Sequence, residues 1–126
     1  MRKVVKVGII SREDYRKRTI AIARGDYIPR RNEPKIWFES LQSMAQVLGS
    51  ENQALLRTIM EHNPRSLAEL EQLTGRKKPN LSRTLKTLER YGIVTLKREK
   101  NRLIPKVNAT DFRVEFGLHY SAPIAA

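Results

Sequence analysis

The chain has 126 residues, with 25 Lys and Arg against 13 Asp and Glu, and therefore a formal net charge of +12 at pH 7. This length predicts one small domain with a short appendage at most and excludes a multi-domain enzyme. The lack of cysteine excludes disulfides, thiolate nucleophiles and cysteine-ligated metal sites, and it favours a cytoplasmic location. The positive charge predicts a polyanionic partner. Because no stretch is apolar enough for a membrane span or a signal peptide, we expect nucleic acid and no membrane.

Residues 1–34 are expected to form an N-terminal strand-helix extension that ends in a Pro-rich linker. The β-branched run 4–10 is typical of a strand. Ser11 with Asp14 three residues later indicates an N-cap, and the helix that it opens is predicted to end near Arg24. The linker 27–34 contains two prolines and marks the boundary of this extension.

The extension carries a net charge of +6, and its basic residues allow two interpretations. On the helix, Tyr15, Thr19 and Ile22 share one face, and we expect the basic side chains to be solvated surface rather than phosphate contacts; they are Arg12, Arg16, Lys17 and Arg18. Arg30 and Arg31 in the linker are expected to be ordinary surface, with an arm in a DNA minor groove as the alternative.

The segment 35–63 is nearly neutral and is expected to supply the core. A first helix is predicted from apolar residues at helical spacing, namely Phe38, Leu41, Met44, Ala45 and Leu48, and it ends at Gly49. Trp37 and Phe38 are expected to be core anchors rather than a platform for base stacking. Ser50 to Gln53 has a capping-box pattern and predicts a second helix with Leu55, Leu56, Ile59 and Met60 facing inward.

Two short helices joined by a tight turn are predicted between residues 66 and 91. The first runs from Ser66 to Gly75, and the second begins at Pro79 and buries a leucine stripe, Leu81, Leu85 and Leu88. This arrangement is a helix-turn-helix. Away from the stripe the second helix presents Asn80, Arg83, Lys86, Thr87 and Arg90. Arginine and asparagine are the side chains that pair with guanine and adenine edges in the DNA major groove, so this face predicts base contacts.

A basic hairpin is predicted after Gly92. Residues 93–98 and 102–107 are strand-like and flank the turn 99–101. Lys97, Arg98, Lys100 and Arg102 cluster at its tip, where a wing reaches phosphates or the minor groove beside a recognition helix. Three helices followed by a basic hairpin predict a winged helix.

Two resemblances support this interpretation. The run SLAELEQLTGRKKPNLSRTLKTLERYGIVTLKREKNRLIPKV resembles the winged helix-turn-helix of MarR-like and ArsR-like regulators, over about residues 50–108. The wider layout, with V-x-V-G-I-x-S, P-K-I-W-F-E-S and a terminal V-E-F, is similar to a family of prokaryotic transcriptional regulators. Some members of that family are paired with a toxin-like partner protein and are classed as antitoxins. The Cys and His positions of ArsR-like metal sensors have no counterpart here, so no metal or other cofactor is expected.

The predicted fold is therefore α+β: an extension over 1–34, a winged helix-turn-helix over 35–108, and a C-terminal strand with a tail over 109–126. The predicted function is sequence-specific binding of double-stranded DNA by a transcriptional regulator that represses its own operon. By position, the resemblance implies DNA contact at Lys78 and Ser82 as well as at the polar face of the second helix. The full set of expected DNA contacts is Lys77, Lys78, Asn80, Ser82, Arg83, Lys86, Thr87, Arg90, Arg98, Lys100 and Arg102.

Other functions stay open at this level. In the first, residues 1–34 bind and neutralise a toxin-like partner protein, and DNA binding is secondary. In the second, the winged helix binds RNA or protein, and in the third the basic face is simply solvated. No reaction is expected, because His62 and His119 have no partner at catalytic or metal-binding spacing.

The two outlying strands, residues 4–10 and 112–118, bear on the oligomeric state. A lone strand is not stable in water, so each needs a partner. Pairing within one chain gives a small sheet, whereas pairing between chains gives a dimer with two recognition helices and a palindromic site. We favour the homodimer.

Overall fold

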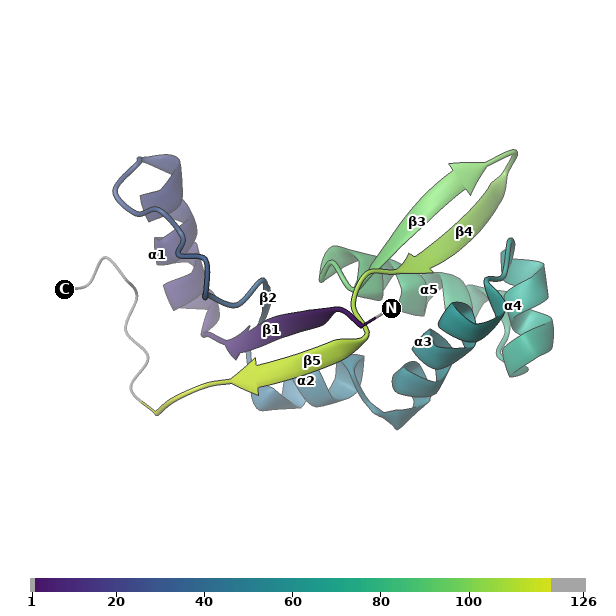
Figure 1. Ribbon diagram of the computed structural model, residues 1–126. Helices are drawn as coiled ribbons and strands as arrows, with labels where there is room; N and C mark the ends of the chain where they lie inside the picture. The colour runs from purple at the N-terminus through teal and green to yellow at the C-terminus, as the bar shows by residue number, and fades with distance from the viewer. Residues whose placement is uncertain (1, 119–126) are drawn as a thin grey trace.

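The computed structural model describes residues 2–118, and within them the chain forms a mixed α+β fold of five helices and two small sheets (Figure 1). In chain order the elements are β1 (Val4–Ile9), α1 (Arg12–Ala23), β2 (Ile36–Phe38), α2 (Leu41–Val47), α3 (Ser50–His62), α4 (Leu67–Thr74), α5 (Lys78–Arg90), β3 (Val94–Glu99), β4 (Arg102–Val107) and β5 (Asp111–Glu115). The tail expected over residues 119–126 lies outside the described residues.

One sheet joins the two ends of the described chain. Its strand order is β2-β1-β5, and β1 is parallel to both neighbours. Val7 lies opposite Ile36 on one side and opposite Val114 on the other. The outlying strands therefore pair with each other within one chain. The argument from unpaired strands for a homodimer no longer holds, and a dimer needs a different interface.

Strand β2 corrects the prediction of a helix that starts at Phe38. Residues 36–38 are β-branched or aromatic and form the edge of the sheet beside β1, and Ile10 donates its amide to the Phe38 carbonyl at 2.9 Å. The helix α2 begins only after Ser40, whose hydroxyl accepts the amide hydrogen of Ser43. Phe38 is fully buried and its ring stacks on Tyr91 at 4.5 Å between centroids, so its expected role as a core anchor is confirmed.

The predicted capping box at Ser50 is wrong. Gly49 is the N-cap of α3, and Ser50 is already the first helical residue. Asn52 and Gln53 instead donate their side-chain amides to carbonyls at the end of α2, at 3.0 Å to Val47 and 2.7 Å to Leu48. These carbonyls have no partner within their own helix, and the two amides supply one. The sharp junction between α2 and α3 is held in this way.

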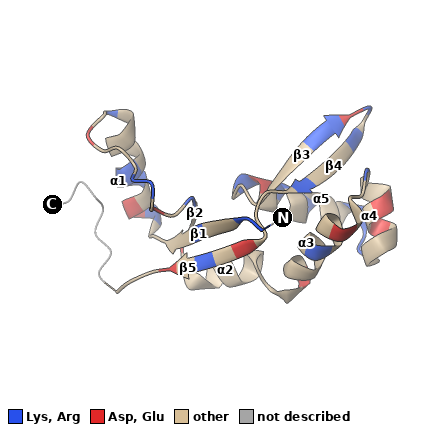
Figure 2. Ribbon diagram, viewed as in Figure 1, with Lys and Arg blue, Asp and Glu red and all other residues tan. Residues whose placement is uncertain are grey.

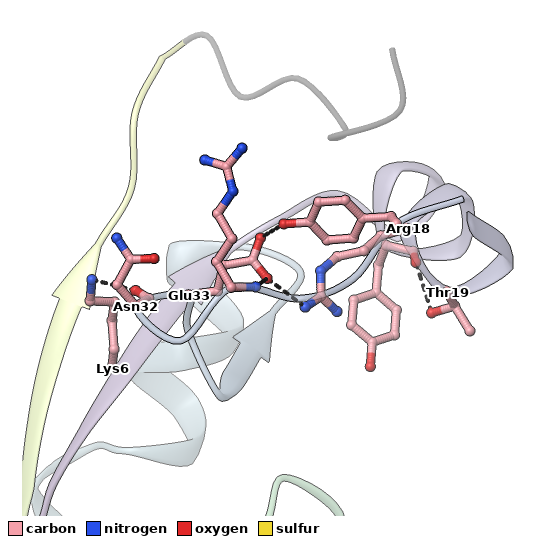
Figure 3. Close-up of polar contacts among 8 residues, drawn as sticks. Lys6, Arg18, Thr19, Asn32 and Glu33 are labelled. Carbon is pink, nitrogen blue, oxygen red and sulfur yellow. Dashed lines mark hydrogen bonds and ion pairs between the residues drawn. The ribbon is translucent and has the colours of Figure 1, made fainter. Parts of the chain in front are cut away.

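Arg18 is not the solvated residue that the sequence predicts. It is 8% exposed and pairs with Glu33 at 3.2 Å (Figure 3). Its guanidinium lies 5.1 Å from the centroid of the Trp37 ring. Tyr27 donates its hydroxyl hydrogen to the same carboxylate. Glu33 and Trp37 therefore provide the charge and the ring that a buried arginine needs. The buried face of α1 is formed by Arg18 and Ala21, while Tyr15 and Thr19 are exposed.

The Glu33 carboxylate is the centre of this contact between α1 and the linker. Burial on its own raises the pKa of Glu33, but the hydrogen bonds from Tyr27, Arg18 and the Arg30 amide outweigh it and hold the pKa below its ordinary value. The hydrogen bond to Glu33 raises the pKa of Tyr27, and burial and the negative charge add to that rise. Both shifts favour the charged carboxylate and the neutral phenol.

A single hydrophobic core contains residues from the extension and from the central helices. Val7 of β1 and Phe38 of β2 belong to the same buried cluster as Leu55 of α3, Leu70 of α4 and Leu85 of α5. The predicted leucine stripe of α5 is fully buried. The sheet and the helix that carries predicted DNA contacts therefore share one core.

The C-terminal strand is shorter than predicted and covers residues 111–115 instead of 112–118. Its ladder with β1 ends at the pair Gly8 and Glu115, because β1 itself ends at Ile9. Phe116 and Leu118 lie beyond this ladder and are 53% and 93% exposed.

Candidate nucleic-acid interface

Helices α4 and α5 are joined by the tight turn that the sequence predicts. Ser66 caps α4 by accepting the amide hydrogen of Glu69 at 3.1 Å. Gly75 ends the helix in the left-handed conformation, with φ of 75°, and donates its amide to the Glu71 carbonyl at 2.8 Å. Since a side chain disfavours this conformation, glycine is what allows α5 to begin three residues later.

Two side chains that the sequence did not single out fix the start of α5. Glu71 accepts the amide hydrogen of Lys78, the first residue of α5, at 2.9 Å. Arg76 donates to Asn52 of α3 at 3.4 Å and to Thr84 of α5 at 3.2 Å. These contacts tie the turn to both neighbouring helices and set the direction of α5. Only the position of Arg76 directly after the helix-ending Gly75 hints at this role in the sequence.

The outer face of α5 is polar and accessible. Asn80, Arg83, Lys86 and Arg90 are exposed, whereas Ser82 and Thr87 are half-buried. Arg83 donates to the Asn80 side-chain oxygen at 3.3 Å, so two of the predicted base-contacting side chains already touch. The Thr87 hydroxyl donates to the Arg83 carbonyl at 3.1 Å. The face thus offers hydrogen-bond donors and acceptors side by side, as predicted from helical spacing.

The hairpin of β3 and β4 has a two-residue turn. Val94 lies opposite Val107 and Glu99 opposite Arg102, which leaves Lys100 and Asn101 at the tip. Both have positive φ, 48° and 65°, as in the type I′ turn that suits the twist of a hairpin. The ammonium group of Lys100 is therefore presented at the far end of the hairpin.

The basic residues of the hairpin divide between its two faces. Arg98 follows Leu96 in the alternation of β3, and both lie on the face that also carries Leu103 and Pro105. Arg102 lies on the opposite face. Lys97 and Lys106 share that face, and both are exposed. The predicted turn over residues 99–101 would set Arg98 opposite Arg102 on one face, but the turn has only two residues, and this shift in register separates the two arginines.

A groove of about 650 Å³ separates the hairpin tip from the helices. Its walls are the start of α4 at Ser66, the start of α5 at Lys78, and the hairpin residues Arg98 and Arg102. Three of the predicted contacts, Lys78, Arg98 and Arg102, therefore line one groove, while Lys77 and Lys100 are exposed next to them in the chain.

Most of the net charge of the chain is found here. Residues 76–106 contain eleven Lys and Arg but only two acidic residues, and Figure 2 shows the basic positions along α5 and both hairpin strands. Within residues 2–118, none of the eight predicted basic contacts is in an ion pair; the only pair in this region joins Lys97 to Glu99 at 3.8 Å. These cations are available to an anionic partner.

The protein is thus a mixed α+β fold, and α4, α5 and the hairpin carry its strongly basic segment. The chain belongs to the HVO_A0114 family, whose family model matches residues 47–114. The matched segment contains α3, α4, α5, both hairpin strands and most of β5, and hence every residue of the candidate interface. No curated protein and no solved structure gave a significant match to the chain.

None of the helices in residues 2–118 has both the length and the apolar character that crossing a membrane requires. The same residues contain no group of three or more His, Asp and Glu side chains arranged to hold a metal ion.

Proposed function

We propose that this protein binds double-stranded DNA through a winged helix-turn-helix and acts as a transcriptional regulator. In this proposal α4 and α5 form the helix-turn-helix, α5 enters the major groove, and the β3-β4 hairpin is the wing. The observation that carries it is the convergence of the basic hairpin with the starts of α4 and α5 at one groove, with no acidic residue paired to the predicted contacts. A merely solvated basic face gives no reason for such convergence.

The two parts of the surface are assigned different tasks. Asn80, Arg83 and Thr87 read base edges, since their side chains have the donors and acceptors that the major groove presents. The lysines and arginines of the hairpin and of the start of α5 contact phosphates, which supply affinity but no sequence information. Autorepression of the protein's own operon remains part of the proposal.

Two alanine variants test this division. Arg83→Ala is expected to cost about 1–3 kcal/mol on the preferred sequence and to relax specificity at one base pair. Lys100→Ala is expected to weaken binding to every duplex equally and to reduce the salt slope by about 1. Fluorescence anisotropy on preferred and scrambled duplexes measures both effects.

The control is Arg24→Ala, which removes one exposed cation from the end of α1, far from the hairpin in Figure 1. Its affinity for DNA should stay within about twofold of that of the unaltered chain. If Arg24→Ala and Lys100→Ala weaken binding equally, net charge alone accounts for the affinity. If Arg83→Ala loses the same amount of affinity on all DNA sequences, α5 does not read bases.

The antitoxin alternative is not favoured by any specific contact. It was motivated by the charge of +6 in residues 1–34, but five of the ten basic side chains there are in ion pairs within the chain: Arg2, Lys6, Arg12, Lys17 and Arg18. We therefore keep DNA binding as the proposed primary function.

A further inference from the structure

The outer edge of β5 is open. Among the described residues β5 pairs only with β1, and it forms the edge of the sheet. Asp111 donates its amide to the Lys3 carbonyl on the β1 side. Because successive amides of a strand point to opposite sides, those of Phe112 and Val114 point outward. An open edge of this kind is a template for a further strand.

An apolar hollow lies directly beside this edge. It has a volume of about 370 Å³ and lies between α2, α3 and β5, with Met44, Leu56, Phe112 and Val114 among its lining residues. Val114 is 41% exposed, and Phe116 just beyond the strand is 53% exposed. A second strand at the β5 edge would place its own side chains over this surface.

The side chains of β5 are self-complementary in one register. We propose that a second copy of this chain pairs its β5 antiparallel to the first, about a two-fold axis at Val114. Residues at equal distances before and after Val114 then face each other. On one face Arg113 lies opposite Glu115 of the other copy, twice over by symmetry. On the other face Phe112 lies opposite Phe116, so the exposed apolar residues cover one another.

The neighbouring registers are less favourable. An axis at Arg113 sets two arginines opposite each other and Asp111 opposite Glu115, which repels at every charged position. An axis at Phe112 pairs Asp111 with Arg113 but leaves Phe116 uncovered, and Asp111 is already held by Arg2 at 2.6 Å. The Val114 axis pairs Arg113 with Glu115 on one face and covers Phe116 with Phe112 on the other, and neither of these alternatives does both. Glu115 also contacts Lys6 at 3.1 Å, and its two oxygens allow both partners.

The pairing joins two three-stranded sheets into one of six strands. The helices α4 and α5 and the hairpin lie at the amino end of β5 (Figure 1), so an antiparallel pair places the two basic surfaces at opposite ends of the joined sheet. The interface uses none of the predicted DNA contacts. It can therefore be tested without DNA, and its failure is distinct from a failure of the proposed function.

The first test is the mass of the full chain by sedimentation equilibrium at about 0.15 M salt, without DNA. We expect twice the 14.6 kDa of one copy at concentrations near 100 μM. Val114→Lys places two like charges across the axis and should give a single-copy mass with an unchanged circular dichroism spectrum. Ile20→Lys is the matched control, because Ile20 is also β-branched and 39% exposed but lies on α1; it should remain a dimer.

The second test fixes the register and uses the absence of cysteine from the chain. Val114→Cys should form a disulfide between copies on mild oxidation, since the axis brings the two residues opposite each other. Phe112→Cys should not, because it faces Phe116. Any of three results overturns the proposal. The unaltered chain has a single-copy mass at all concentrations, the dimer survives Val114→Lys, or Phe112→Cys forms the cross-link and Val114→Cys does not.

Discussion

At the scale of single residues, Gly8 is the position where the sheet admits no side chain. A Cβ atom there would lie 2.6 Å from the Trp37 ring and 2.8 Å from Pro34. Both neighbours are rigid rings, so Gly8→Ala is expected to lower the free energy of unfolding by about 1–3 kcal/mol. Gly117→Ala is the control, since nothing lies within 4 Å of its Cβ position. Urea unfolding measures the free energy of unfolding of both variants. If Gly8→Ala and Gly117→Ala are equally stable, Trp37 does not pack on β1 as described.

The lowered pKa of Glu33 leads us to expect that the stability of the fold depends on pH. Because its pKa is lower in the folded chain than the ordinary 4.5, its stabilisation is present above that value and is lost as pH falls through the folded pKa. Glu33→Gln should lower the free energy of unfolding by about 1–3 kcal/mol at pH 7. The difference from the unaltered chain should shrink as pH falls below the ordinary 4.5 and the folded carboxylate becomes protonated.

Unfolding titrations at several pH values measure this difference. Glu61→Gln is the control, because Glu61 is exposed on α3 and its side chain makes no hydrogen bond or ion pair within residues 2–118. If the difference in the free energy of unfolding between Glu33→Gln and the unaltered chain stays constant as pH falls well below 4.5, the carboxylate charge does not have this role.

At the scale of elements, the hairpin tip has a residue in an unfavourable conformation at the proposed point of contact with DNA. Lys100 has φ of 48°, a region that asparagine tolerates better than lysine. Lys100→Asn is therefore expected to raise the free energy of unfolding by about 0.5–1 kcal/mol while it weakens binding to all duplexes. Thermal unfolding and anisotropy, run in parallel, measure the two effects.

The control for the hairpin removes the same charge from a regular strand position. Lys106 is exposed on β4, where asparagine is a poor strand former, so Lys106→Asn should gain no stability. If Lys100→Asn is both more stable and fully active on DNA, the lysine is not at the tip for phosphate contact.

The elements that the sequence predicted best are those with local signals. Ser66 and Gly75 mark the ends of α4, the leucine spacing marks the buried face of α5, and two basic strand-like runs mark the hairpin. Strand β2 was missed because three residues become a strand only through pairing with β1, a partner distant in the sequence. Long-range pairing leaves no trace in local periodicity.

The same reason explains what was missed at the candidate site. Helical spacing was enough to name the exposed face of α5. The burial of Arg18 depends on Glu33 and Trp37, which reach it only in the folded chain, and the role of Arg76 depends on Asn52 of α3. A lone basic residue in a sequence looks solvated whether or not such partners exist.

At the scale of the whole molecule, eleven of the 25 Lys and Arg lie in residues 76–106, and this concentration of charge predicts how salt acts on DNA binding. The candidate interface contains eight Lys and Arg, of which Arg83 is assigned to a base. If between about four and seven of the others neutralise phosphates, log K falls with log salt at a slope between about −4 and −6 per copy. Anisotropy from 0.05 to 0.5 M salt measures the slope; a slope near zero contradicts phosphate contact.

The central claim is that the chain reads a sequence in double-stranded DNA, and selection from a random duplex library near 0.15 M salt tests it most directly. The selected duplex and a scrambled one are then compared by anisotropy. Our account predicts an enriched site with two-fold symmetry and a preference of at least about 1000-fold over the scrambled duplex. No enrichment, with equal affinity for both duplexes, would contradict it and leave only general attraction to polyanions.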